Sequence, residues 1–304
     1  PNMVVLHGRR TANRRLLHFV ARELGCRVLW TGDGLLPHTM QVNERGLDGE
    51  SSMAGREAFD YRSVRNQPAL LDASLANMLA HTTPFALARR EVSPPPLRTR
   101  LADAIAGVGS GWHNLEHAIH SWQTAEPVRD PPVAKFTLPN EPFIAVLLQA
   151  SDDERLLLDT DCAPSPIQLV TATARAAYGL DPTLRVVAVL PDAGLHHRDL
   201  RALVRIPGVT IAAATAAPEA AAMAVATTTI NHPMAIASLL AGTPVLHVGR
   251  TLYGLPSVTH KGPTPLFLAM LRQAVTADNE PTLRQRMLTW LIGHTHLWCS
   301  PTHP

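Results

Sequence analysis

The sequence predicts an α/β protein whose two parallel-sheet halves enclose a cleft. Short runs rich in Val, Ile and Leu alternate with segments of helical periodicity, a rhythm typical of parallel sheets covered by helices. A proline-rich stretch, TAEPVRDPPVAKFTLPNEP, separates the halves. We therefore expect an α/β domain with a helical insertion over residues 1–140. A second α/β domain, with C-terminal helices, is expected over residues 141–304.

The N-terminal half opens with a β-α-β pattern. Met3–Gly8 has the composition of a buried strand, and Arg27–Trp30 that of a second strand. Between them, Thr11–Leu24 carries apolar residues at the spacing of an amphipathic helix. Further helical stretches are expected around Pro68–Leu79 and over Leu97–Gln123.

The C-terminal half repeats the alternation of strand and helix more plainly. The expected strands are Phe143–Leu148, Leu184–Leu190, Val209–Ala212, Thr227–Ile230 and Pro244–Val248. The expected helices are Pro164–Tyr178, His196–Val204, Pro218–Met223 and Met234–Leu240. In such a sheet, ligands bind beyond the carboxyl ends of the strands.

Composition excludes several classes of protein. The chain has 304 residues and a formal net charge of +2, which gives no support for a nucleic-acid partner bound through a strongly basic surface. No apolar run reaches the roughly 18 residues of a transmembrane helix. The three cysteines are too far apart for a local metal site or a disulfide scaffold. We expect a soluble, cytoplasmic protein.

The common cofactor and metal motifs are absent, since GxGxxG, GxxxxGK[ST], GxSxG and HExxH do not occur. His113, His117 and His120 would share one face of a helix. A structural helix face is favoured over a metal site there, because no further ligand completes the set. We therefore expect no metal and no bound cofactor.

Two segments place acidic residues after buried strands. In TGDGLLPHTMQVNERGLDGESS (residues 31–52), glycines and acids follow the second strand, which indicates either a functional loop or an ordinary surface loop. In VLLQASDDERLLLD (residues 146–159), Gln149, Asp152 and Asp153 follow a strand. A carboxylate there can act as nucleophile or base toward a sugar, or can simply begin a helix.

A third segment offers a phosphate site. In residues 227–262 a strand ends at Asn231 and a helix follows Pro233, so backbone N–H groups at the helix start would favour a phosphate.

Together, these segments resemble the Kps-type capsule polysaccharide biosynthesis proteins, which are retaining β-Kdo transferases. DGLLPHTMQVNERGLD resembles the family's ENGLLPxTxxxDxxGVN, LLQASDDER its PLQxxxDxQ, and NHPMAIASLLAGTPV its NST…GxPV. GRTLYGLPSVTHKG resembles GxxxYxxPGLTHxG, and Trp112–Asn114 is a weaker echo of KYN. The resemblance spans roughly residues 1–262.

The resemblance implies a GT-B-like fold, with two Rossmann-type parallel-sheet domains and a cleft between them. It implies transfer of Kdo from CMP-Kdo to a lipid-linked glycan acceptor at the inner face of the inner membrane. It also implies capsule-assembly proteins as possible partners. The N-terminal domain would then face the acceptor and the C-terminal domain the donor. The implied site residues are Asp153 as nucleophile, Asp33 or Glu44 as acid/base, Gly34, Pro37 and Asp48 toward the acceptor, and Gln149, Asn231, His232, His196, His197, Arg250 and Tyr253 toward the donor.

The sequence departs from the family pattern at several positions. The family's KxHP motif aligns with Ala188–Pro191, which lacks both the lysine and the histidine. The family's NST aligns with Asn231–Pro233, where His232 replaces the serine. The glutamine of PLQxxxDxQ is replaced by Arg155, and Asp33 lies one residue from the expected acid. Two readings follow: an active transferase that uses histidines and Arg250 for the phosphate, or a catalytically inactive relative that binds a glycan or a protein partner.

Overall fold

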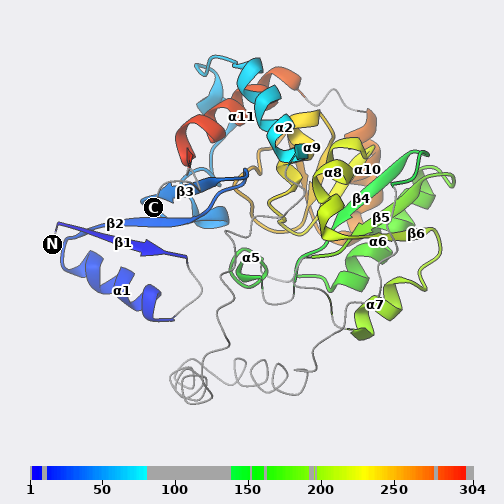
Figure 1. Cartoon of the computed structure of the whole chain (residues 1–304), viewed down its shortest axis with the longest axis horizontal. Coiled ribbons are helices and arrows are strands. Elements are labelled where there is room, and N and C mark those ends of the chain that lie inside the picture. The colour runs from blue at the N-terminus through cyan, green and yellow to red at the C-terminus, as the bar shows by residue number, and fades with distance from the viewer. Residues whose placement is uncertain are drawn as a thin grey trace.

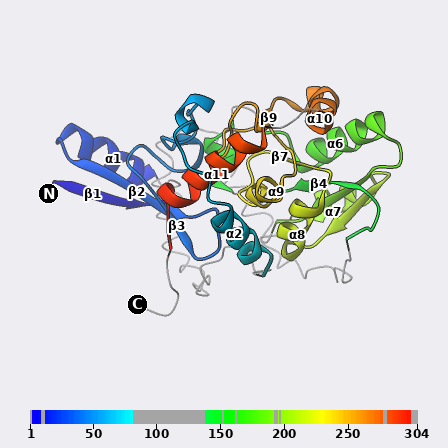
Figure 2. The same cartoon turned by 90° about the horizontal axis from the view of Figure 1, so that it is seen from above.

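The computed structural model describes residues 2–8, 12–80, 138–150, 153–160, 163–191, 195, 197–276 and 280–298. Within these ranges the chain forms two β-sheets that lie side by side along the molecule, with helices around and between them (Figures 1 and 2). The predicted helix over Leu97–Gln123, its three histidines, the Trp112–Asn114 echo and all but the end of the proline-rich stretch lie outside these residues.

The C-terminal sheet is entirely parallel, and its strands lie in the order β6-β5-β4-β7-β8-β9. Numbered along the chain from β4, this is the 3-2-1-4-5-6 order of a Rossmann sheet. The order reverses between β4 and β7. The strands are β4 (Phe143–Leu147), β5 (Arg185–Val189), β6 (Val209–Ala212), β7 (Ala226–Thr229), β8 (Val245–His247) and β9 (Thr259–Lys261).

Helices cover both faces of this sheet because its central strand is apolar throughout. Successive residues of β4 alternate between two cores: Ile144 and Val146 belong to one, and Ala145 and Leu147 to the other. The first core includes α6 and α10, and the second includes α2, α8, α9 and α11. The helices are α2 (Pro68–Ala80), α5 (Glu154–Leu158), α6 (Pro166–Leu180), α7 (His197–Leu203), α8 (Ala217–Met223), α9 (Ala235–Ala241), α10 (Phe267–Thr276) and α11 (Pro281–Thr295).

The N-terminal sheet is mixed. Its order is β1-β2-β3-β10, formed by Met3–His7, Arg27–Asp33, Thr39–Asn43 and His296–Trp298. Only β1 and β2, joined by α1 (Ala12–Glu23), are parallel as the sequence predicted, whereas β3 and β10 run antiparallel to their neighbours. The five residues between β2 and β3 are too few for a parallel crossover, so these strands must run antiparallel.

The last strand returns to the N-terminal sheet, where His296–Trp298 pairs with β3. Before it, α11 packs on α2 and α9 in the core of the C-terminal sheet and also contacts β3 and β10, and it therefore bridges the two sheets (Figure 2). The division into domains at residues 140 and 141 stays a prediction. None of the helices in the described ranges is long and apolar enough to cross a membrane.

Helix α1 differs from the expected amphipathic arrangement. Leu16 and Phe19 are both 62% exposed, and Leu24, just after the helix, is 74% exposed, while Ala21 is buried against the sheet. The inner face of the helix also carries His18, whose ring accepts a hydrogen bond from the indole of Trp30 at 3.2 Å. The helical period was therefore predicted correctly, but most of the apolar side chains face outward.

Candidate functional site

Polar side chains gather where the strand order of the C-terminal sheet reverses. Just beyond the carboxyl ends of β4 and β7 lie Gln149 and Asn231, which are 4% and 3% exposed. Gln149 Nε2 donates to Asn231 Oδ1 at 2.8 Å, and the Asn231 backbone N–H donates to Gln149 Oε1 at 3.1 Å. Ligands of Rossmann sheets bind outside the strand ends at this reversal, so the amide pair marks the candidate site.

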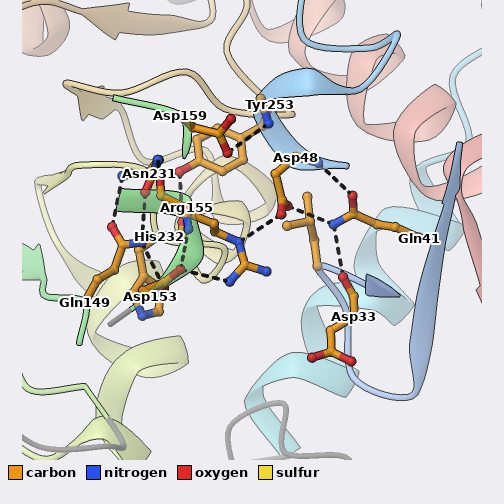
Figure 3. A network of polar contacts seen from close by, with 12 residues as sticks. Asp33, Gln41, Asp48, Gln149, Asp153, Arg155, Asp159, Asn231, His232 and Tyr253 are labelled. Carbon is orange, nitrogen blue, oxygen red and sulfur yellow. Dashed lines mark hydrogen bonds and ion pairs between the residues drawn. The ribbon is translucent and has the colours of Figure 1, made fainter. Parts of the chain in front are cut away.

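Asp153 adjoins this pair (Figure 3). It is the N-cap of α5: its Oδ1 accepts a hydrogen bond from the Arg155 backbone N–H at 2.8 Å. Its Oδ2 accepts from Gln149 Nε2 at 3.1 Å, and Arg155 Nη1 lies 3.7 Å from Oδ1. The structure thus confirms the helix-start interpretation of Asp153. These contacts also fix a partly exposed carboxylate beside the strand reversal.

Arg155 connects this cluster to the N-terminal sheet. Its Nε lies 3.3 Å from Oδ2 of Asp48, a residue that is 7% exposed. Gln41, on β3, donates from Nε2 to Asp48 Oδ1 at 3.0 Å and to the Asp33 carbonyl at 3.1 Å. The Asp48 carboxylate is therefore paired with the Arg155 cation and oriented by the Gln41 amide. It occupies the space between the two sheets.

His232 supplies a neutral imidazole. Its Nδ1 accepts a hydrogen bond from the Met234 backbone N–H at 3.1 Å, so the ring proton lies on Nε2. Burial lowers the pKa of His232 to about 4, while the Asp153 carboxylate acts to raise it. Tyr253 donates its hydroxyl to the His232 carbonyl at 2.8 Å. Burial raises the pKa of Tyr253, which therefore stays a hydrogen-bond donor.

Asp159 closes the far side of the cluster. Its Oδ2 accepts from the Gly49 backbone N–H at 3.3 Å, and a Cβ on Gly49 would lie 2.5 Å from Oδ1. Its carbonyl accepts from the Arg250 backbone at 2.7 Å, while the Arg250 guanidinium donates to the Leu158 carbonyl at 2.8 Å. The family resemblance implied that Arg250 binds the donor. In the structure, Arg250 is hydrogen-bonded to Leu158 and Asp159 at the C-terminal end of α5.

The other predicted residues of the N-terminal half are not all brought together. Asp33 is exposed at the end of β2, and Gly34 and Pro37 are buried in the turn that follows. Glu44 forms an exposed ion pair with Arg27, the first residue of β2. Arg27 and Asp33 are at opposite ends of β2, ~20 Å apart at about 3.3 Å per residue, and the structure does not place Glu44 in the cluster.

Asp152, His196 and the side chain of His197 lie outside the described residues. Within the described ranges, no three His, Cys, Asp or Glu side chains come together in a group that could hold a metal ion.

Three members of the cluster were not assigned a role from the sequence: Gln41, Arg155 and Asp159. Gln41 stood inside a segment interpreted as loop, where the alternation of TMQVN was the available signal for a strand. Asp159 follows the apolar run LLL, and a buried acid after such a run indicates a polar partner nearby. Nothing local indicated that Arg155 would pair with Asp48.

No protein-family model and no curated protein sequence matches the chain. Among solved structures it is similar to the KpsC β-Kdo 2,4 transferase of Thermosulfurimonas dismutans, with 14% identity over 94% of this chain and 78% of that one, and a TM-score of 0.50. The KpsC β-Kdo 2,7 transferase of that organism has 14% identity over 94% and 74% of the two chains, and a TM-score of 0.42. The glycosyltransferase SnogD of Streptomyces nogalater has 15% identity over 53% and 42%, and a TM-score of 0.35.

The similarity to the KpsC β-Kdo 2,4 transferase, at 14% identity, shows which fold this chain has. The chain has the GT-B-like α/β fold of glycosyltransferases, which confirms the fold class predicted from the sequence. This fold is shared with the KpsC β-Kdo 2,4 transferase, in agreement with the resemblance of the sequence motifs to those of the Kps-type proteins.

Proposed function

We propose that this protein is a capsule-polysaccharide glycosyltransferase that transfers Kdo from CMP-Kdo to a lipid-linked glycan, with retention of configuration. The observation that carries the proposal is the position of Asp153. The carboxylate lies beside the strand reversal of a glycosyltransferase fold, held by the Gln149 amide at 3.1 Å. That amide also binds Asn231, so carboxylate and amides form one pre-arranged polar surface.

The proposed reaction has two displacements. The Asp153 carboxylate attacks the anomeric carbon of Kdo, the bond from that carbon to the phosphate oxygen breaks, and CMP leaves with the electron pair. An acceptor hydroxyl then attacks the same carbon, loses its proton to a base, and releases Asp153. Asp33 is the better candidate for that base, because it is exposed at the carboxyl end of β2, whereas Glu44 lies away from the cluster in an ion pair.

His232 is the residue best suited to the leaving phosphate. Its Nε2 carries the proton, so it can donate a hydrogen bond to a phosphate oxygen without being a cation. Tyr253 acts by holding the His232 backbone. His196 and His197 stay candidates for further phosphate contacts, and no metal is needed for this chemistry.

The lipid-linked acceptor would bring the protein to the cytoplasmic face of the inner membrane, with capsule-assembly proteins as possible partners. These parts of the proposal follow from the Kps-type resemblance.

A second function is favoured by one observation. Arg155, at the position of the family's glutamine, contacts both Asp153 and Asp48 and so fills part of the space between the sheets. A relative in which this ion-pair cluster has become purely structural would bind a glycan or a partner without transfer.

Two measurements separate these functions. The first is release of CMP from CMP-Kdo in the presence of a lipid-linked glycan. The second is calorimetric titration with CMP. Release together with micromolar CMP binding supports the transferase, whereas a folded protein that neither releases nor binds CMP supports the non-catalytic relative.

A further inference from the structure

Strand β1 forms one end of the N-terminal sheet, and its outer edge pairs with no strand in the part of the chain that the structure describes. Figures 1 and 2 show β1 and α1 at the end of the molecule away from the C-terminal sheet. The sequence of β1, MVVLH, contains no proline and no Asp, Glu, Lys or Arg. Edge strands are normally protected by such residues, because an open edge pairs readily with another strand. The unprotected edge of β1 therefore suits a further strand.

The backbone groups at this edge are spaced for an antiparallel partner. Toward β2, the Asn2 carbonyl accepts a hydrogen bond at 3.0 Å and the Gly8 N–H donates one at 2.8 Å. Because successive residues of a strand direct their backbone groups to opposite edges, those of Met3, Val5 and His7 point to the outer edge. The hydrogen-bonded pairs of an antiparallel ladder also recur at every second residue. A second β1, placed with Val5 opposite Val5, can use all three positions.

Helix α1 carries an apolar stripe on the side of this edge. Arg15 lies 3.5 Å from the carboxylate of Glu50, in the turn after β3, so this side of α1 faces β3. At about 3.6 residues per turn, Leu17, Val20 and Leu24 lie on the opposite side of the helix, which is the side of β1. These three side chains are 53%, 42% and 74% exposed.

The other face of the sheet is also apolar along this edge. Leu6 of β1 is buried in the core that includes Ala21 of α1. Because side chains alternate along a strand, Met3 and Val5 point to the face opposite α1. They are 52% and 55% exposed. The open edge of β1 thus lies between two exposed apolar surfaces, one on each face of the sheet.

The five exposed side chains have the extent of a protein–protein interface. At exposed fractions of 42–74%, they present on the order of 500 Å², which is about the apolar share of the ~800 Å² that each partner buries in a standard interface. A lipid surface would not satisfy the backbone groups of the edge, because the hydrocarbon of a bilayer offers them no hydrogen-bond partner. A second copy of this chain satisfies them and brings an identical apolar surface with it.

We propose that two copies of this chain associate through β1, with the two strands antiparallel about a two-fold axis at Val5 and the α1 stripes packed on one another. The N-terminal sheets of the two copies then form one continuous sheet. This interface includes no residue of the polar cluster, so the proposal does not depend on the transferase activity.

Analytical ultracentrifugation of the whole chain measures the association. We expect a species with twice the mass of one chain and no larger species. Val5→Pro is the sharpest variant, because the Val5 N–H points to the outer edge and proline removes a donor that β2 does not use. Leu17→Glu places a charge in the α1 stripe. Each variant should raise the dissociation constant of the dimer at least tenfold.

Val204→Glu is the matched control, because Val204 is 64% exposed in the C-terminal half, and it should leave the dimer unchanged. Thermal melting confirms that each variant is folded, and Leu17→Glu decides the question if Val5→Pro does not fold. A monomer at every concentration, or a dimer that folded Leu17→Glu leaves intact, would overturn the proposal. So would a monomer that binds phosphatidylglycerol vesicles through Leu17, which would assign the surface to lipid. CMP release is measured separately, so failure here is distinct from failure of the transferase proposal.

Discussion

Arg155 and Asp48 form an ion pair between the two sheets, with Nε 3.3 Å from Oδ2. Arg155 belongs to α5 beyond β4, and Asp48 to the 3₁₀ turn after β3. Their side chains are 19% and 10% exposed. Asp48 also has a φ of 49°, in the left-handed region that non-glycine residues seldom adopt. The polar cluster therefore has a structural part, this ion pair, beside the proposed catalytic carboxylate.

Breaking this ion pair should destabilise the fold. Arg155→Gln leaves the buried Asp48 carboxylate without its cation, and we expect the free energy of unfolding to fall by about 1–3 kcal/mol. Asp48→Asn should cost a similar amount, and the double variant less than the sum. Urea denaturation of the four proteins measures the coupling. Arg27→Gln, which breaks the exposed pair with Glu44, should cost under about 1 kcal/mol. Strictly additive effects of Arg155→Gln and Asp48→Asn would contradict the coupling.

Gly34 is required by close packing in the turn between β2 and β3. A Cβ at this position would lie 2.0 Å from Thr39 Oγ1 and 2.8 Å from the Thr39 carbonyl. Gly34→Ala should therefore lower the free energy of unfolding by at least about 2 kcal/mol. Gly55→Ala is the matched control, because a Cβ there has no atom within 4 Å. Equal melting temperatures for the two variants would show that the turn is not packed as described.

His296 joins the end of the chain to the turn after β2. Its Nε2 accepts a hydrogen bond from the Leu35 backbone N–H at 2.9 Å, and its Nδ1 lies 3.0 Å from the Leu291 carbonyl. His296→Leu leaves the Leu35 N–H buried without this acceptor, so amide hydrogen exchange at Leu35 should accelerate markedly. The exposed His294 provides the control, and His294→Ala should not change exchange at Leu35. Unchanged protection in His296→Leu would rule out the contact.

Acid should weaken the fold through two histidines, of which His247 is buried and His232 is partly buried. Burial lowers the pKa of His232 and of His247 to about 4, from an ordinary value of 6.5. Because the unfolded chain binds these protons first, their stabilising contribution is complete above pH 6.5. It is lost as the pH falls toward 4, by up to about 1.4 kcal/mol per pH unit for each histidine.

Urea unfolding at several pH values between 7 and 4 measures this dependence. His247→Gln should show a shallower decline than the original protein, although it is less stable at pH 7 because it loses the imidazole contacts to Gly249 and Thr259. An equally steep decline in the variant would assign the effect to other groups.

The sequence predicted the C-terminal sheet well because local information was sufficient there. The run Phe143–Leu148 is apolar at every position and forms the buried central strand β4. Each β-α unit places its polar residues at the same edge, so Gln149, Asp153 and Asn231 could be expected to meet.

Long-range pairing was not accessible in the same way. The pairing of β10 with β3 joins segments more than 250 residues apart, and the three residues of β10 carry no periodicity that identifies a strand. The outward-facing leucines of α1 conflict with the usual rule that apolar faces are buried. The Arg155–Asp48 pair depends on how the two sheets are placed, which no local pattern encodes. The motif resemblance indicated Asp48 as a site residue, but it did not indicate that Arg155 is its partner.

The catalytic role of Asp153 is the central claim, and mass spectrometry with CMP-Kdo tests it most directly. Without an acceptor, the protein should release CMP and carry Kdo covalently on the peptide that contains Asp153. Asp153→Asn should abolish both while remaining folded, because asparagine can still cap α5. Asp181→Asn, at an exposed aspartate bound to Thr183, should behave like the original protein. Undiminished CMP release and transfer by Asp153→Asn would contradict the account.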